Sequence, residues 1–255
     1  MTLKITWQID NSDLERLREF VESRMSDRFV QVRIERNLWD SRDPPTDSDF
    51  WKILVYALLT TQQRSGPQSA VSRFCRVEPF PLSLEECRSR RQDELEDYIR
   101  GSLESFGGLR RQNIISDYLT LNLERLDQGG LWKEVRSWLV SLSNAVDPRS
   151  ERNAANFLAD NLKGIGPKQS RNVLQMLGMT RHEIPIDSRI TKWLNDFGFP
   201  IQLSAAMLSD RHYYEFVSDG IQELCKAADV IPCVLDAAIF SSFDDGGWEE
   251  VFLPI

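Results

Sequence analysis

Apolar residues recur every three or four positions along most of the chain, which is the period of a helix with one buried face. Within the segment 50–63, for example, Trp51, Leu54 and Leu58 fall on the same side. The same period predicts helices over residues 50–63, 82–91, 95–106, 109–126, 131–142, 152–162, 167–177, 188–196 and 204–225. Glycine pairs separate several of these segments, as turns do. The pattern therefore predicts a mainly α-helical fold.

The first 47 residues follow a different pattern, because apolar and polar residues alternate in two short stretches. One stretch covers residues 5–9 and the other residues 30–34, with a helical period between them. Alternation with a period of two is typical of a strand. The sequence Asp43-Pro44-Pro45 then interrupts the pattern, since a residue before proline avoids the helical conformation. We expect a small N-terminal β element ahead of the helices.

Composition limits the size of the core and the kind of partner. The chain has 255 residues, 41% of them apolar, which is enough for one large core or two smaller lobes. Its net charge of −8 argues against a protein that coats nucleic acid without specificity. Residues 162–192, however, carry six Lys or Arg and two Asp or Glu, so this segment has a charge of +4 and the rest −12. A local basic patch for DNA remains compatible with the acidic total.

The cysteines and the hydropathy of the chain bear on its compartment. Cys75, Cys87, Cys225 and Cys233 are scattered and form no C-x-x-C pair, which argues against a disulfide framework and against a four-thiolate metal site. No apolar run approaches the roughly 20 residues that cross a bilayer. The N-terminus lacks the layout of a signal peptide. We expect reduced, buried cysteines and no metal in a protein that is cytoplasmic and nucleoid-associated, or nuclear, and neither secreted nor bound to a membrane.

One segment, residues 162–174, carries the signature of a helix–hairpin–helix. Gly164 and Gly166 permit the left-handed backbone of a tight hairpin, and Pro167 suits the first position of a second helix. Ile165 lies between the glycines and would pack between the two helices. The free N–H groups of such a second helix bind a phosphate oxygen without reading a base. An ordinary turn that joins two core helices is the alternative interpretation.

Lys168 and Asp187 are the candidate reactive residues. Lys168 falls in the first turn of the second helix, where the helix dipole disfavours a cation by about 0.3–1 kcal/mol. A phosphate contact would explain this position, and so would a role as a nucleophilic amine with a lowered pKa. Asp187 lies nineteen residues further on, between a short apolar stretch and a predicted helix. On its own, Asp187 is best interpreted as a helix N-cap.

The hairpin, its lysine and an aspartate at this distance resemble the helix–hairpin–helix superfamily of DNA glycosylases, which includes endonuclease III and the 8-oxoguanine glycosylase/lyases. Lys163 stands where the family usually has proline, and Ser170 where it has alanine. Residues 58–63 also resemble the family's L-L-S-x-Q stretch, and residues 107–114 its G-x-x-x-x-K-A-x-x-I segment. The resemblance covers residues 51–194, more than half of the chain.

This resemblance implies an enzyme that flips a base out of the duplex and excises it. The amine of Lys168 would attack C1′ of the sugar, and the resulting Schiff base would allow β-elimination, so that the enzyme is also a lyase for apurinic or apyrimidinic sites. Asp187 would stay ionised and stabilise positive charge on the sugar. Gln62 would fill the space that the flipped base leaves. The residues implied to contact DNA are Gln62, Lys163, Gly164, Ile165, Gly166 and Arg171.

Further features refine the resemblance. Only Cys225 and Cys233 follow Asp187, so we expect no iron–sulfur cluster and no other cofactor, as in the cluster-free 8-oxoguanine DNA glycosylase/AP lyases. Asp236 lies in a segment similar to one in which an acidic residue borders the base pocket. The two-lobed glycosylase fold implies one lobe at 48–178 and a second built from 1–47 and 179–255.

The partner implied is double-stranded DNA that contains a damaged or modified base, with 8-oxoguanine as the first candidate, bound by a monomer. Three alternatives remain open at this point. The substrate of the same fold could be an oxidised pyrimidine or an alkylated base. The chain could also be a noncatalytic helix–hairpin–helix DNA-binding protein in which Lys168 only contacts phosphate. Finally, an all-helical scaffold without a role on nucleic acid agrees with the acidic charge.

Overall fold

The computed structural model describes residues 6–39, 42–63, 66–144 and 147–243. Within these residues the chain forms α-helices joined by loops and a short 3-10 helix, and no strand. The helices are α1 (Asn11–Glu22), α2 (Arg28–Asn37), α3 (Asp47–Leu59), α4 (Ala70–Cys75), α5 (Leu84–Arg88), α6 (Gln92–Phe106), α7 (Gln112–Asp127), α8 (Leu131–Asn144), α9 (Pro148–Asn161), α10 (Pro167–Met176), α11 (Ser188–Phe197), α12 (Arg211–Ala228) and α13 (Pro232–Ser242), with the 3-10 helix at Met207–Ser209. The prediction of a mainly α-helical fold is confirmed.

The predicted N-terminal β element is wrong where the structure describes it. The alternating residues Val30 to Ile34 lie in α2, whose buried face also includes the polar side chains of Arg33 and Asn37. Val30, Arg33 and Asn37 follow a helical spacing of three and four, which the apolar residues alone conceal. The other stretch begins at Ile5, outside the described residues, and residues 6–9 form no strand.

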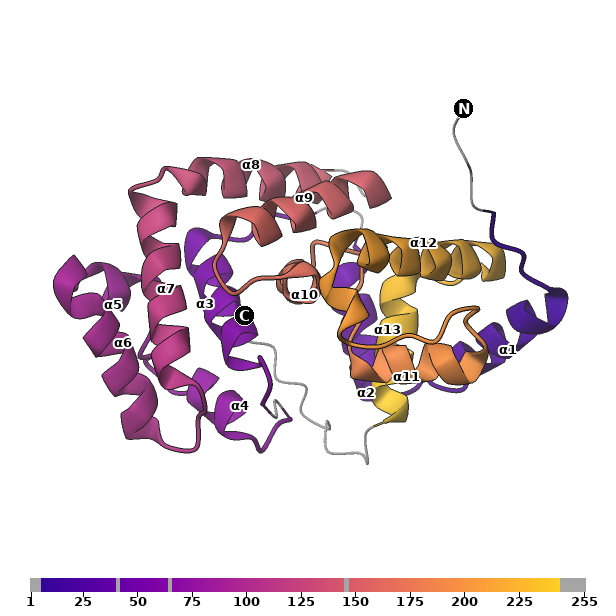
Figure 1. The fold of residues 1–255 in the computed structure, drawn as a ribbon, viewed down its shortest axis with the longest axis horizontal. Coiled ribbons are helices and arrows are strands. Elements are labelled where there is room, and N and C mark those ends of the chain that lie inside the picture. The colour runs from indigo at the N-terminus through magenta and orange to yellow at the C-terminus, as the bar shows by residue number, and fades with distance from the viewer. Residues whose placement is uncertain (1–5, 40–41, 64–65, 145–146, 244–255) are drawn as a thin grey trace.

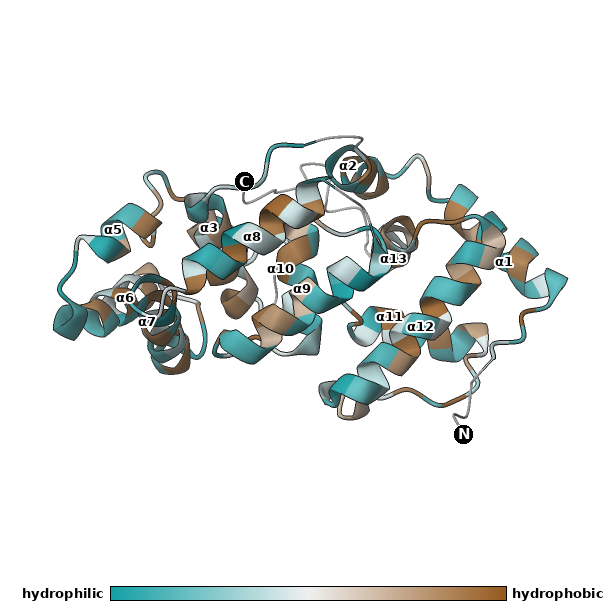
Figure 2. Ribbon diagram, turned by 90° about the horizontal axis from the view of Figure 1, so that it is seen from above, coloured by the Kyte–Doolittle hydropathy of each residue, from teal (hydrophilic) through white to brown (hydrophobic). Residues whose placement is uncertain are grey.

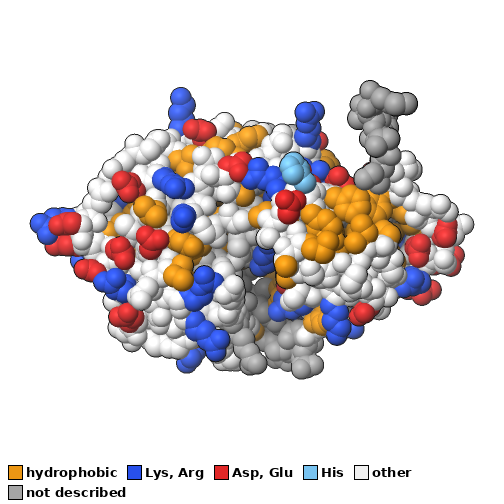
Figure 3. Space-filling view, viewed as in Figure 1, with side chains coloured by type: hydrophobic (Ala, Val, Ile, Leu, Met, Phe, Trp, Pro, Cys, Tyr) orange, Lys and Arg blue, Asp and Glu red, His pale blue; other side chains and the backbone are white. Residues whose placement is uncertain are grey.

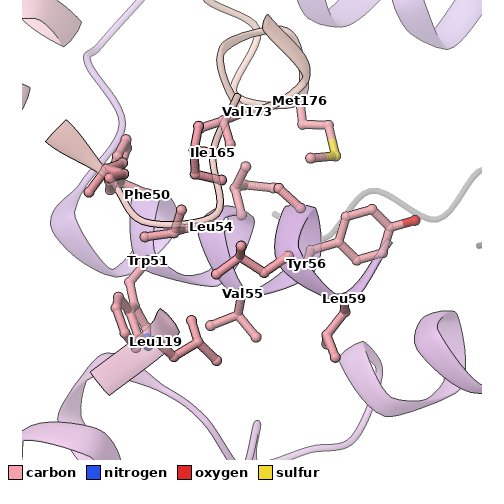
Figure 4. Packing of buried hydrophobic residues seen from close by; sticks show 14 of the residues in the cluster. Phe50, Trp51, Leu54, Val55, Tyr56, Leu59, Leu119, Ile165, Val173 and Met176 are labelled. Atoms are coloured by element: carbon pink, nitrogen blue, oxygen red, sulfur yellow. The ribbon is translucent and has the colours of Figure 1, made fainter. Parts of the chain in front are cut away.

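Two hydrophobic clusters form the interior. The first lies around α3, which is buried on nearly all sides and contacts α4, α5, α7 and α10. Figure 4 shows Val173 and Met176 of α10 on one side of α3 and Leu119 of α7 on the other. The second cluster joins α1, α2, α11, α12 and α13. Figure 1 shows the helices of the first cluster on the left, those of the second on the right, and α10 between them.

Each cluster is built from amphipathic helices, as Figure 2 shows for α6, α7 and α12, which carry hydrophilic and hydrophobic residues on different faces. The first cluster draws its buried residues from positions 50–179. The second draws them from positions 17–30 and 184–239, and so from both ends of the chain. The predicted lobe boundaries, at residues 47 and 178, stay a prediction.

Buried charges hold the connector between α10 and α11 in place. Glu183 of this connector accepts hydrogen bonds from Arg171 Nε at 2.9 Å and from Arg152 Nε at 2.8 Å. Ser218 and Gln222 of α12 donate to the same carboxylate. Arg171 and Glu183 are both 0% exposed, so their charges are compensated inside the protein. This network links α9, α10 and α12 through a single side chain.

A second buried carboxylate orders the same connector through its backbone. Glu151 of α9, 1% exposed, accepts the backbone N–H groups of residues 181–183 at 2.8–2.9 Å. Burial raises the pKa of Glu151 to about 7, although these N–H groups act in the opposite direction. The connector that leads to Asp187 is therefore fixed from the first cluster.

The four cysteines are buried and form no disulfide, as predicted. Burial raises the pKa of the Cys75 and Cys87 thiols to about 12, which keeps them protonated and unreactive near neutral pH. None of the described helices is long and apolar enough to span a membrane.

Candidate active site

A cavity of about 1100 Å³ lies where the two clusters meet. Its walls come from α2, α3 and the loop after it, α10, the start of α11, and α13. Figure 3 shows a hollow between the two halves of the molecule, with Lys and Arg side chains on both sides of it. Four of the predicted site residues line the cavity, namely Gln62, Lys168, Asp187 and Asp236. Gln62 and Asp236, which are 174 positions apart in the sequence, thus line the same cavity.

The hairpin between α9 and α10 has the geometry that the sequence predicts at Gly164 but not at Gly166. Gly164 has a left-handed φ of 79°, and a Cβ there would lie 2.3 Å from Tyr118 Cδ2 and 2.8 Å from Leu58 Cδ2. Gly166 has an ordinary φ of −95° and serves as the N-cap of α10, with open space where a Cβ would stand. Only Gly164 is required by the backbone and by packing; the prediction of a left-handed Gly166 is wrong.

The side chain of Asn122 in α7 fixes the hairpin through two hydrogen bonds to its backbone. Its side chain donates to Lys163 O at 3.0 Å and accepts from Lys163 N at 2.6 Å, although Asn122 itself is 0% exposed. The Ile165 side chain is buried in the first cluster, in agreement with its predicted packing between the two helices. A DNA contact by Ile165 could therefore use only its backbone. Lys163, Gly164 and Gly166 are exposed on the surface of the hairpin.

Lys168 lies at the second position of α10, directly after Pro167, and lines the cavity. Burial lowers the pKa of its amine, while the carboxylates of Asp187 and Asp236 act in the opposite direction. Its Nζ lies 3.5 Å from Gln169 Oε1, and Gln169 in turn donates to Ala57 O and Thr61 Oγ1, both at 2.8 Å. The neighbour of Lys168 thus ties α10 to the end of α3.

Asp187 is the N-cap of α11, as its position in the sequence predicts. Its Oδ1 accepts the backbone N–H groups of Arg189 at 2.8 Å and Ile190 at 3.1 Å. Its Oδ2 lies 3.2 Å from Arg189 Nη1, and Asp187 remains half-buried at the cavity wall. The helix end thus fixes one carboxylate oxygen of Asp187, and Arg189 pairs with the other.

Gln62 lies at the rim of the cavity in a left-handed conformation, with a φ of 59°. Arg111, from the loop before α7, also has a left-handed φ of 61°, and its Nη1 donates to Gln62 Oε1 at 2.8 Å. A left-handed backbone costs a residue other than glycine about 1–2 kcal/mol. The two predicted family segments, residues 58–63 and 107–114, therefore meet at the rim. The sequence prediction included no role for Arg111.

Asp236 is 7% exposed and joins a polar group that sequence reasoning missed. Its Oδ2 accepts hydrogen bonds from Arg33 Nη1 of α2 and from Gln175 Nε2 of α10, the latter at 2.8 Å. Arg33 and Gln175 also line the cavity. The strand predicted at residues 30–34 concealed Arg33, and Gln175 lies beyond the motif around Lys168.

Arg171 is a correction to the predicted DNA contacts. Its guanidinium is 0% exposed and pairs with Glu183, with a position over the Tyr214 ring at 5.0 Å. A side chain enclosed in this way reaches no DNA phosphate. Its basic charge, counted in the local patch of the sequence, is used inside the protein.

Among the described residues, no group of three or more His, Cys, Asp or Glu side chains is arranged to hold a metal ion. The expectation that the protein needs no cofactor stays a prediction. The chemistry that the cavity itself offers is a half-buried amine, Lys168, with carboxylates close enough to act on it. Such a pair suits nucleophilic attack that develops positive charge on the substrate.

Comparison with solved structures identifies the fold. The chain is similar to the 8-oxoguanine DNA glycosylase of Methanocaldococcus jannaschii, with a TM-score of 0.63 and 17% identity over 91% of this chain and 95% of that one. A structure of the same enzyme, described as a glycosylase/lyase in complex with a 15mer DNA that contains 8-oxoguanine, matches with a TM-score of 0.63 and 16% identity over 89% of this chain and 97% of that one.

The 8-oxoguanine DNA glycosylase of Thermotoga maritima is similar over 91% of this chain and 95% of its own, with a TM-score of 0.57 and 18% identity. No protein-family model matches the chain. No curated protein sequence matches it either. The similarity therefore lies in the fold, over nearly the full length of both partners.

Proposed function

We propose that this chain, which has the fold of the 8-oxoguanine DNA glycosylases, is a DNA glycosylase that excises a damaged or modified base and then cleaves the strand. A shared fold does not by itself determine function, so the proposal depends on the residues of the site. The observation that carries it is the position of Lys168 and Asp187 on the wall of one cavity, next to an exposed hairpin.

DNA binding is supported by the surface around this cavity. The hairpin presents Lys163 and the first N–H groups of α10, which can bind a phosphate without reading sequence. Arg110 and Arg189 add positive charge to the cavity wall. We propose double-stranded DNA as the partner, as in the similar structure with bound DNA. The acidic remainder of the chain would limit contacts to this face.

Base flipping would explain the left-handed backbones of Gln62 and Arg111 at the rim of the cavity. An extruded nucleotide leaves a gap in the duplex, and the protein must compensate for the lost stacking. Gln62 stands at the rim, held by Arg111 in a conformation that costs energy. Backbone strain of this kind concentrates at functional sites. We assign Gln62 to the gap beside the orphaned partner base, with Arg111 as the residue that positions its amide.

The reaction follows from the amine and the carboxylate. The neutral amine of Lys168 attacks C1′ of the deoxyribose, the bond from C1′ to the base breaks, and the base leaves with the electron pair and takes up a proton. Asp187 stabilises the positive charge that develops on the sugar. The amine and the opened sugar then form a Schiff base. Loss of a proton from C2′ expels the 3′ phosphate and nicks the strand.

The first candidate for the lesion is 8-oxoguanine, because the similar structures are described as 8-oxoguanine glycosylases. Oxidised pyrimidines and alkylated bases are the competing substrates. Base release from duplexes that each contain one of these lesions tests the proposal. We expect release from at least one lesion duplex, followed by nicking on the 3′ side.

The control variants separate catalysis from binding. Lys168→Gln should lose nicking but still bind duplex DNA. Lys133 is an exposed residue of α8, and Lys133→Gln should behave as the wild type. Duplex binding without base release or nicking by the wild type would instead indicate a noncatalytic DNA-binding protein. No duplex binding at low salt would contradict any role on DNA.

A further inference from the structure

The side chain of Gln169 connects α10 to the end of α3. Its amide Nε2 donates hydrogen bonds to Ala57 O and to Thr61 Oγ1, both at 2.8 Å. Gln169 is 9% exposed, and these contacts use both N–H groups of its amide. The amide is therefore held by a helix other than the one that carries it.

The orientation of this amide follows from its partners. Ala57 O is a backbone carbonyl oxygen and can only accept a hydrogen bond, so the amide NH2 group must face it and Gln169 Oε1 must face the other way. On that side, Oε1 accepts from Asn172 Nδ2 at 3.2 Å and lies 3.5 Å from Lys168 Nζ. A carbonyl oxygen is thus turned toward the candidate nucleophile.

The contact between Gln169 and Lys168 does not follow from their adjacent places in the sequence. Consecutive side chains on a helix point in directions about 100° apart and do not face each other. The amide faces the amine because Ala57 and Thr61 hold it. Thr61 directly precedes Gln62, which we assign to the gap of a flipped nucleotide. The acceptor beside the amine is therefore anchored next to the loop that would contact the opened duplex.

We propose that Gln169 is a positioning residue for the amine of Lys168, an inference that rests on the proposed glycosylase function. The flexible four-carbon stem of lysine lets its amine point in many directions, and attack requires the nitrogen lone pair to be aligned with C1′. A fixed acceptor that binds one N–H of the amine removes part of this freedom before the substrate arrives. Lys168 lines the cavity and Gln169 lies behind it, so Gln169 acts through the amine and not on the substrate.

The same contact acts on the protonation of Lys168. A carbonyl oxygen stabilises an ammonium group more than a neutral amine, because a hydrogen bond from a charged donor is the stronger one. Asp187 and Asp236 also raise the pKa of this amine, whereas burial and Arg189 lower it. Removal of the carbonyl oxygen alone should therefore lower the pKa of Lys168 while the charged groups around it stay in place.

Gln169→Met tests the proposal, because methionine has a similar length and lacks the amide. Nicking of an abasic duplex is measured in a single turnover between about pH 6 and pH 10. We expect a maximal rate about ten- to a hundredfold below that of the wild type, together with a midpoint at lower pH. Affinity for a duplex that contains tetrahydrofuran, an abasic analogue that forms no Schiff base, should stay within about twofold. A wild-type rate, or a midpoint that stays in place or rises, would overturn the proposal.

Asn195→Leu is the matched control. Asn195 is a half-buried residue of α11 whose amide also bridges its helix to another segment, through two hydrogen bonds to the backbone of Leu203. Its loss should lower the stability and leave the rate and the midpoint of nicking unchanged. If Gln169→Met does not fold, Thr61→Val takes its place, since it removes one of the two anchors of the amide. This variant should shift the midpoint in the same direction but less far, and an unmoved midpoint would overturn the proposal.

A measurement without DNA separates this proposal from the proposed function. Acetic anhydride reacts with neutral amines, so acetylation of Lys168 at different pH, followed by mass spectrometry, reports the pKa of this amine. We expect a lower midpoint in Gln169→Met than in the wild type. Equal midpoints, together with nicking by the wild type, would refute the role of Gln169 alone. A lower midpoint in a protein that neither releases a base nor nicks an abasic duplex would refute the proposed function itself.

Discussion

Arg111 Nη1 lies 2.8 Å from Gln62 Oε1, and both residues have left-handed backbones in loops that are 49 positions apart. The hydrogen bond is exposed, so its net contribution to stability is small. The arrangement instead fixes an amide at the rim of the cavity, where we propose that the gap left by a flipped nucleotide lies. The left-handed backbones of Gln62 and Arg111 add little to the stability of the fold, so we relate them to the proposed role of Gln62 in DNA binding.

The first prediction concerns Gln62→Gly. Glycine adopts the left-handed conformation without cost, which offsets the lost hydrogen bond, so the free energy of unfolding should stay within about 0.5 kcal/mol of the wild type. Base excision should nevertheless fall at least about tenfold, because one well-placed hydrogen-bonding group is worth that much. Urea unfolding and single-turnover excision measure the two effects. Unchanged excision in this variant would remove Gln62 from the mechanism.

The second prediction concerns the buried ion pair of Arg171 and Glu183. Removal of one partner leaves the other charge buried and uncompensated, so Arg171→Met should lower the free energy of unfolding by about 3–5 kcal/mol. Arg91 pairs with Glu94 on the surface at 72% side-chain exposure, and Arg91→Met should cost at most about 1 kcal/mol. Denaturant titration compares the two. A loss below about 1 kcal/mol for Arg171→Met would show that the connector is held by other contacts.

The third prediction compares two glycines of the hairpin. Gly164→Ser places a Cβ within 2.3 Å of Tyr118 at a left-handed φ, so this variant should be destabilised by about 2 kcal/mol or more. Gly166→Ser meets open space and supplies a good N-cap residue, so the stability should be unchanged or slightly higher. Thermal unfolding distinguishes them. Equal midpoints would contradict the described hairpin.

The fourth prediction concerns pH. Only the neutral amine of Lys168 is nucleophilic, so nicking of an abasic duplex should rise with pH as this amine loses its proton. Because burial lowers the pKa of Lys168, the midpoint should lie below the usual 10.5. The Asp187 carboxylate raises this pKa, so Asp187→Asn should shift the midpoint to a lower pH while reducing the maximal rate.

Asp196→Asn, an exposed acid on α11, is the matched control and should leave the midpoint in place. Rates are measured in a single turnover between about pH 6 and pH 10, the range in which a lysine of lowered pKa titrates, with DNA binding checked at each pH. A shift to higher pH in Asp187→Asn would show that Asp187 does not act electrostatically on the amine.

The sequence predicts the fold where buried faces are apolar and periodic. It fails at α13, whose residues 232–239 are all buried, because a helix enclosed on every side has no amphipathic period. It also misses α4, which at six residues is too short for a period to show. The error at α2 has a related cause, since its buried face includes Arg33 and Asn37.

The sequence predicts a site residue only where that residue belongs to a local motif. Lys168 and Asp187 are prominent because the hairpin and the helix cap have local signatures. Arg33 and Gln175 have none; their roles arise from packing between α2, α10 and α13. Arg171 was misassigned for the opposite reason, because a basic residue in a basic segment does not reveal a buried partner such as Glu183.

The central claim is that Lys168 becomes covalently attached to the sugar. Borohydride reduces a Schiff base to a stable amine, so the protein incubated with a lesion or abasic duplex can be trapped, digested and analysed by mass spectrometry. We expect a conjugate whose sugar remnant is on the Lys168 side chain, and no conjugate with Lys168→Gln. A remnant on another amine, or normal trapping by Lys168→Gln, would show that Lys168 is not the nucleophile.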